Sequence, residues 1–120
     1  MPRRVLVVDD YEDARELLGL ILEHVGFKVL LAANGADAVE IARLEHPDVV
    51  VMDLFMPGMD GIEATRRIKA DPASQEVPVI AYTARTAPLD ESEQLFSGVC
   101  IKPCSPDRLI AMLHGALGMA

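Results

Sequence analysis

The 120-residue sequence predicts a doubly wound α/β fold, in which helices cover both faces of a parallel sheet. Two observations support this fold class. Short apolar runs alternate with longer amphipathic stretches along the whole chain, with no linker, repeat or low-complexity segment between them. The runs also lack strict polar/apolar alternation, which is typical of parallel strands that are buried on both faces. The five predicted strands cover residues 5–8, 27–31, 49–52, 77–82 and 99–101.

Three helices are predicted between the first four strands. In the first, Gly26 is placed to end the helix, and apolar residues follow helical spacing. A second helix is expected from Asn34-Gly35 to about residue 45, and a third from Asp60-Gly61 to about residue 70. The inward face of the first helix is predicted to consist of Ala14, Leu17, Leu18, Ile21 and Val25.

Two more helices complete the pattern. Residues 88–96 leave room for only two or three turns. Ser105-Pro106 forms a good N-cap and first-turn pair for the last helix. Five strand–helix units favour a doubly wound sheet, because crossovers are right-handed and both faces must be covered. The inner face of the last helix is expected to be Leu109, Met112, Leu113 and Ala116.

Composition narrows the possible functions. A hydrophobic content of 51% and a charged content of 25% are typical of one globular domain, here residues 1–120. The net charge of -8 argues against direct binding of nucleic acid. The apolar run after the N-terminus is too short for an export signal, and no segment is long enough to span a membrane, so a cytoplasmic protein is expected. The only cysteines, Cys100 and Cys104, are too few for a zinc site and are expected to be reduced thiols.

Polar side chains follow four of the five predicted strands. Asp9 and Asp10 follow the first strand, Asp53 the third, Thr83 the fourth and Lys102 the fifth. Because parallel strands end at the same sheet edge, these residues should converge in one crevice. Three carboxylates raise one another's pKa unless a cation such as Mg²⁺ neutralises them. Together with a lysine and a hydroxyl they indicate a phosphoryl-binding site, in which a carboxylate can act as nucleophile.

The motifs at these positions resemble the receiver domain of two-component response regulators over residues 4–117. The matching segments are VLVVDD at 5–10, NGADAVEIARLEHPDVVVMDLFMPGMDG at 34–61, YTA at 82–84 and KP at 102–103. The resemblance implies a flavodoxin-like (βα)5 fold with strand order 2-1-3-4-5. It also implies a phosphoryl-accepting signalling domain that turns over no free substrate.

The resemblance implies a role for each site residue. Asp53 would be the phosphoacceptor and would attack the phosphorus in line. Asp10 would ligate Mg²⁺ directly and Asp9 through water, and Asp53 and the backbone carbonyl of Phe55 would complete the protein ligands. Thr83 and Lys102 would bind phosphoryl oxygens, and the peptide bond from Lys102 to Pro103 is expected to be cis. The phospho-donor would be a histidine kinase or a histidine phosphotransfer protein, and the output protein is not identified.

Each residue also has an ordinary structural explanation when taken alone. Asp10 could cap a helix, Asp53 could occupy a turn, Thr83 could end a strand and Lys102 could lie on the surface. Their joint occurrence at consecutive strand ends, with the family spacing, favours the site. An Asp-nucleophile phosphatase is disfavoured because Phe55 stands where such enzymes carry a second acid.

Some positions depart from the receiver pattern. Val99 replaces the usual Tyr or Phe three residues before the lysine, Leu95 replaces a common glycine, and residues 83–102 form a shorter segment than usual. These departures suggest an unusual output surface beside intact phosphorylation chemistry. They also leave open the alternative of a phosphorylation-independent interaction module.

Overall fold

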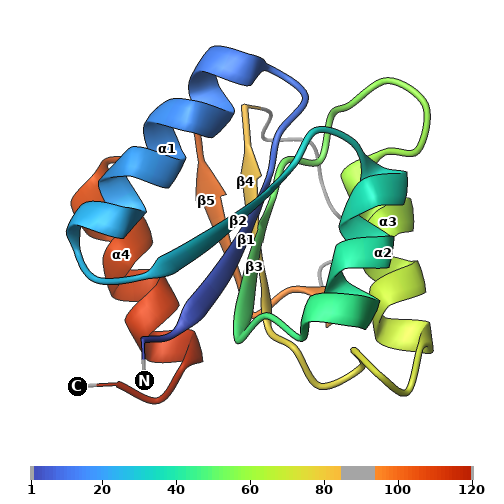
Figure 1. Cartoon of the computed structure of the whole chain (residues 1–120). Helices are drawn as coiled ribbons and strands as arrows, with labels where there is room; N and C mark the ends of the chain where they lie inside the picture. The colour runs from blue at the N-terminus through green and yellow to red at the C-terminus, as the bar shows by residue number, and fades with distance from the viewer. Residues whose placement is uncertain (1, 85–93, 120) are drawn as a thin grey trace.

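The computed structural model describes residues 2–84 and 94–119 and contains one sheet of five parallel strands in the order β2-β1-β3-β4-β5. The predicted fold class and strand order are confirmed. Helices α1 and α4 cover one face of the sheet, and α2 and α3 cover the other (Figure 1). The strands are β1 (Arg4–Val8), β2 (Lys28–Ala32), β3 (Val49–Met52), β4 (Val79–Thr83) and β5 (Gly98–Ile101).

Alternate residues of the interior strand β1 contribute to two separate cores. Leu6 and Val8 point into the core beneath α2 and α3. Val5 and Val7 point into the core beneath α1 and α4. Because successive side chains of a strand leave opposite faces, a strand covered on both sides must be apolar throughout. This explains why the run is uninterrupted until it reaches the acids at the sheet edge.

The first helix, α1 (Glu12–His24), faces the sheet through a narrower stripe than the sequence predicted. Leu18 and Leu22 are buried, whereas Leu17 is 60% exposed and Val25, just beyond the helix, is 43% exposed. Leu18 and Leu22 are four positions apart and share one helix face, while Leu17 lies about 100° away from Leu18 around the axis. The inward assignment of Leu17 and Val25 was therefore wrong.

The other three helices begin at their predicted caps: α2 (Gly35–Glu45), α3 (Gly61–Ala70) and α4 (Pro106–Ala116). The side chain of each cap residue, Asn34, Asp60 or Ser105, accepts a hydrogen bond from the backbone N–H three residues later. The short helix predicted at 88–96 lies largely outside the described residues. Among the described helices, none has the length and apolar character needed to cross a membrane.

Replacing Asp60 with alanine is expected to destabilise the fold by about 1 kcal/mol, the usual cost of losing an N-cap. Its carboxylate accepts the Glu63 N–H at 2.8 Å, and alanine leaves that donor without a protein acceptor. Urea denaturation would measure the change. Glu16→Ala, on an exposed part of α1, is a matched control and should change stability by less than about 0.5 kcal/mol. An equal loss in both variants would contradict a capping role.

The prediction that the two cysteines are reduced thiols was wrong. Cys100 and Cys104 are joined by a disulfide, with their Cα atoms 5.8 Å apart. Cys100 belongs to β5, and the turn after this strand brings Cys104 back beside it before α4 begins. The expectation of reduced thiols did not take account of this turn, which brings the pair together.

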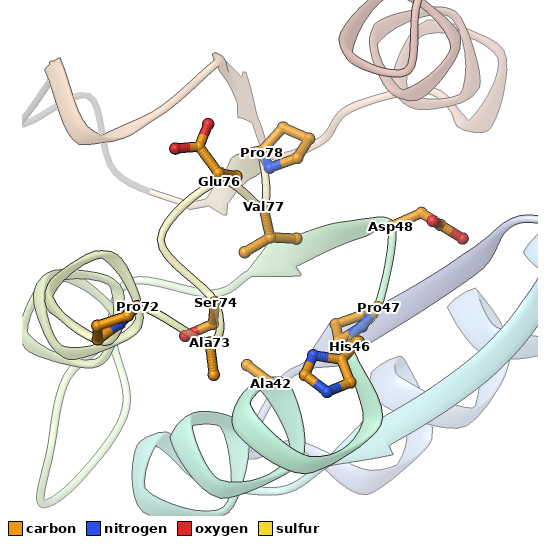
Figure 2. Close-up of a pocket in the computed structure, with 10 residues that line it drawn as sticks. All are labelled: Ala42, His46, Pro47, Asp48, Pro72, Ala73, Ser74, Glu76, Val77 and Pro78. Atoms are coloured by element: carbon orange, nitrogen blue, oxygen red, sulfur yellow. The ribbon is translucent and has the colours of Figure 1, made fainter.

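A hollow of about 280 Å³ lies between the α2–β3 and α3–β4 connections (Figure 2). His46, Pro47 and Asp48 line it immediately before β3, and Val77 and Pro78 line it immediately before β4. It therefore opens at the amino ends of the strands. The polar strand ends identified in the sequence lie at the opposite edge of the sheet.

Candidate functional site

Two neighbouring strands place the acidic residues side by side. Asp9 follows β1 and Asp53 follows β3, and these strands pair with Val8 opposite Met52. The backbone N–H of Asp53 extends this ladder by donating to the Val8 carbonyl at 3.0 Å. Asp9, Asp10 and Asp53 each offer a carboxylate oxygen, and these oxygens lie within 4.8 Å of one another. The structure therefore brings the three predicted acids together.

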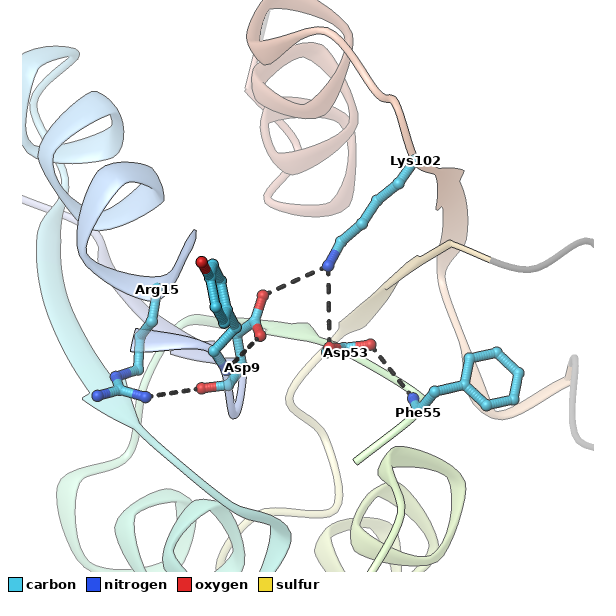
Figure 3. A network of polar contacts seen from close by, with 6 residues as sticks. Asp9, Arg15, Asp53, Phe55 and Lys102 are labelled. Atoms are coloured by element: carbon cyan, nitrogen blue, oxygen red, sulfur yellow. Dashed lines mark hydrogen bonds and ion pairs between the residues drawn. The ribbon is translucent and has the colours of Figure 1, made fainter. Parts of the chain in front are cut away.

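Lys102 reaches the acids from the end of β5. Its Nζ lies 3.4 Å from Oδ2 of Asp9 and 3.8 Å from Oδ2 of Asp53 (Figure 3). The other oxygen of Asp9, Oδ1, accepts the backbone N–H of Tyr11 at 2.9 Å. Ion pairs thus join the Lys102 ammonium to two of the three clustered carboxylates, so negative charge remains in excess among these four groups.

The buried position of Asp53 disfavours the charged form of its carboxyl. The residue is only 7% exposed, and this loss of solvation is the main cause that raises the pKa of its carboxyl. The Lys102 ammonium and the Phe55 N–H, which donates to Asp53 Oδ1 at 3.2 Å, offset part of the rise in this pKa. The charges of Asp9 and Asp10 add to it. A cation beside the three carboxylates would relieve both repulsion and desolvation.

Thr83 closes the site on the β4 side. It is the last residue of β4 and is buried at the same sheet edge as Asp53. Its backbone carbonyl accepts the N–H of Lys102 at 2.7 Å. This bond continues the β4–β5 pairing and fixes the backbone from which the lysine side chain extends.

Phe55 lies in the loop that connects β3 to α3. Its backbone N–H points at Asp53, while its ring points away from the acids (Figure 3). The residue is 40% exposed. The Phe55 backbone is therefore close enough to Asp53 to belong to the site, whereas its side chain is turned away from the acids.

The lysine also contacts an aromatic ring that the sequence analysis did not assign to the site. Nζ of Lys102 lies 4.8 Å from the centroid of the Tyr82 ring. Tyr82 pairs with Cys100 across β4 and β5, and Lys102 follows Cys100 by two positions. The strand period places Tyr82 and Lys102 on one side of the sheet, opposite to Thr83. Only the register of β5 against β4 could have revealed this pairing.

Comparison with known proteins identifies the family. The family model described as the response regulator receiver domain matches residues 5–114. The chain belongs to the response regulator receiver family. It is therefore a phosphoryl-accepting signalling domain of two-component systems. Receiver domains bind Mg²⁺ in an acidic pocket and interact with histidine kinases or phosphotransfer proteins.

Two relatives resemble this receiver domain over nearly their full lengths. Protein PilH of Pseudomonas aeruginosa is 37% identical over 95% of this chain and 97% of its own. The polar-differentiation response regulator DivK of Brucella anthropi is 35% identical over the whole of both chains.

A solved structure matches the fold and carries a metal. It is the receiver domain of a sensor histidine kinase from Pseudomonas aeruginosa, with a magnesium ion coordinated in its active-site cleft. It is 30% identical to this chain and superposes with a TM-score of 0.90, covering 98% of this chain and 99% of the other.

Proposed function

We propose that Asp53 is the residue that accepts the phosphoryl group in this receiver domain. The observation that carries this proposal is the position of its carboxylate, which lies between two other acids and the Lys102 ammonium at the carboxyl edge of the sheet. Asp53 is buried enough to exclude bulk water from much of its surface, yet it opens to the same edge as its neighbours. A carboxylate in such a place can form an acyl phosphate.

The acidic cluster fits Mg²⁺ by the chemistry of its donors. Its three carboxylate oxygens are close enough to share one ion, and hard divalent cations prefer oxygen ligands. Asp9, Asp10, Asp53 and the backbone carbonyl of Phe55 would hold the ion. When bound, Mg²⁺ would neutralise charge on the carboxylates and on the incoming phosphoryl group.

The protein groups have separate tasks in phosphoryl transfer. A carboxylate oxygen of Asp53 attacks the phosphorus in line with the bond to the leaving group, and the donor departs with that bonding pair. Lys102 is within reach of Asp53 and would follow the transferred group as a mobile positive charge. The Thr83 hydroxyl would donate to a phosphoryl oxygen from the end of β4. These groups act chiefly by positioning and by neutralising charge, as is general for phosphoryl transfer.

The donor is a histidine kinase or a histidine phosphotransfer protein in this proposal, and the product signals by changed protein contacts. No turnover of a free substrate, direct contact with nucleic acid or association with a membrane is part of the proposed function. The proposal includes a cytoplasmic location, with residues 1–120 folding as one receiver domain. Val99 packs as a partly buried residue beside the α2–α3 core, so the proposed change of contacts does not depend on an aromatic ring at this position.

Intact mass spectrometry tests the phosphoacceptor. Incubation with Mg²⁺ and acetyl phosphate should add one phosphoryl group, and peptide mapping should place it on Asp53. Chelation of Mg²⁺ should abolish the addition. Absence of phosphorylation with acetyl phosphate and also with a phosphorylated histidine phosphotransfer protein would refute the proposal, as would a phosphoryl group located on Asp9 or Asp10.

A further inference from the structure

We propose that Cys100 and Cys104 form a reversible disulfide that controls the position of Lys102 and thereby the reactivity of the acidic site. This inference rests on the proposed function of that site. The two cysteines lie two residues before and two residues after Lys102, so the disulfide encloses Lys102 in a ring of five residues. The ring connects the end of β5 to the N-cap of α4.

The backbone geometry allows the bond to form within the native fold. The Cα atoms lie 5.8 Å apart, inside the usual range of about 4.4–6.8 Å for disulfides. The two cysteines also belong to the same packed region beneath α1 and α4, where Cys100 is fully buried and Cys104 is partly buried. No rearrangement of the sheet is required to bring them together.

The two cysteines differ in solvent exposure and therefore have different roles in the oxidation. Cys104 is partly exposed and is the thiol that an oxidant from solvent can reach. Cys100 has no exposed surface, so within the native fold its accessible reaction partner is the sulfur of Cys104. A hydroperoxide would oxidise the Cys104 thiol to a sulfenic acid and release water or an alcohol. The Cys100 sulfur would then attack the Cys104 sulfur, and the sulfenic hydroxyl would leave with the Cys100 proton as water. A thiol reductant reverses the bond by exchange: two of its thiols supply two electrons and two protons to the cysteine sulfurs and are themselves joined in a disulfide.

The disulfide can act at the site because Lys102 is the middle residue of the ring and both its backbone and its side chain contact the site. The N–H of Lys102 is bonded to the Thr83 carbonyl at 2.7 Å, and its Nζ lies above Tyr82 and between Asp9 and Asp53. A short ring removes little chain entropy compared with a long one, so its main effect is local. In the oxidised form the ring holds the lysine backbone in the arrangement seen here. In the reduced form residues 101–104 gain freedom, and the ammonium spends less time beside the acids.

The test compares oxidised and reduced protein. Mild peroxide should remove two hydrogen atoms from the intact mass, and mapping should show a peptide linked through Cys100 and Cys104. Phosphorylation by acetyl phosphate with Mg²⁺ should be roughly threefold faster or more in the oxidised form, because small displacements of positioning groups alter rates strongly. Cys104→Ser, which alters only the partly exposed sulfur, should react at the rate of reduced wild type and ignore peroxide.

A second measurement separates this inference from the proposed function. Oxidation should shift the amide NMR resonances of Asp9 and Asp53 in wild type but not in Cys104→Ser, whether or not the protein accepts a phosphoryl group. Resonance shifts with no phosphorylation of either form, by acetyl phosphate or by a phosphorylated histidine phosphotransfer protein, would support the disulfide coupling and refute the phosphoacceptor. A failure of the disulfide to form, or equal rates and unchanged resonances in the two forms, would overturn the inference.

Discussion

Replacing Asp53 with asparagine is expected to abolish phosphorylation and, in the absence of metal, to stabilise the fold. Asparagine lacks the anionic oxygen that attacks phosphorus, so the phosphoryl addition should fall below detection. The stability gain has a separate origin. The pKa of Asp53 is raised chiefly by burial, so the charged carboxylate is less favourable in the folded protein than in the unfolded chain. A neutral isostere should relieve a penalty on the order of 1 kcal/mol, or roughly 4 °C in melting temperature.

The pH dependence of this gain follows from the direction of the shift. Because the pKa of Asp53 is higher in the folded state, the folded protein binds more protons between the unfolded and folded pKa values. In the wild-type protein, the stabilising contribution of proton binding at Asp53 is therefore fully present below the pKa of the unfolded state. This contribution is lost as the pH rises through the pKa of the folded state. The advantage of Asp53→Asn should be largest near neutral pH and shrink in acid.

Thermal melts with a chelator and with Mg²⁺ would test both parts. Mg²⁺ should stabilise wild type by mass action and stabilise Asp53→Asn less, because the variant offers a weaker ligand. Glu16→Gln, on an exposed part of α1, is a control for the loss of one negative charge. A variant that melts below wild type in the chelator at neutral pH would contradict the electrostatic account of the cluster.

Replacing Gly61 with alanine is expected to destabilise the fold by about 3 kcal/mol and to impair the site as well. A Cβ at this position would overlap the backbone carbonyl oxygen of Asp53 and lie 2.7 Å from the Leu54 Cα. Both obstacles are backbone atoms, which cannot rotate away as a flexible side chain can. The start of α3 or the end of β3 must therefore move, and forced overpacking of this kind is costly.

The Gly61→Ala substitution should also affect function, because Gly61 packs against the backbone of the phosphoacceptor Asp53. The N–H of Gly61 donates to the Leu54 carbonyl at 3.0 Å, which fastens α3 to the residue after Asp53. A shift of this contact should displace Asp53 relative to Lys102 and slow phosphorylation, by roughly tenfold or more. Urea denaturation and the acetyl phosphate assay would measure the two effects.

Gly115→Ala provides the matched control for Gly61→Ala. Gly115 lies in α4, and a Cβ there would meet no described atom within 4 Å apart from its chain neighbours and the backbone of its own helix. Alanine at this helical position should be neutral or stabilising by up to about 1 kcal/mol, because it lowers the entropy of the unfolded chain and favours helix. Equal effects of the two substitutions would show that close packing against Asp53 is not what makes Gly61 necessary.

Much of the fold could be predicted because its signals are local. Continuous apolar runs identify strands buried on both faces, and Asn34, Asp60 and Ser105 cap the helices that they were expected to cap. The ends of parallel strands share one edge whatever the details of packing, so the convergence of Asp9 and Asp53 followed from topology. The cis peptide between Lys102 and Pro103 was also expected, through the family resemblance, and is present.

Local patterns were insufficient where two elements must be placed against each other. The apolar residues of α1 could not show which of them face the sheet, and the rotation of the helix selects Leu18 and Leu22 over Leu17. The spacing of Cys100 and Cys104 gave no sign of the turn that brings their backbones within bonding reach. In each case the answer depends on a rotation or a turn that is set by packing of the whole domain.

The sequence by itself determined the order of elements, their caps and the residues that stand at the strand ends, because each of these depends on neighbours along the chain. Only the tertiary structure decided the contacts that define the site. Lys102 meets Asp9 across 93 positions of sequence, and it lies over Tyr82 because of the β4–β5 register. The raised pKa of Asp53 likewise arises from burial and from charges on other strands. Distances between strands, and the desolvation that follows from them, exist only once the sheet has formed.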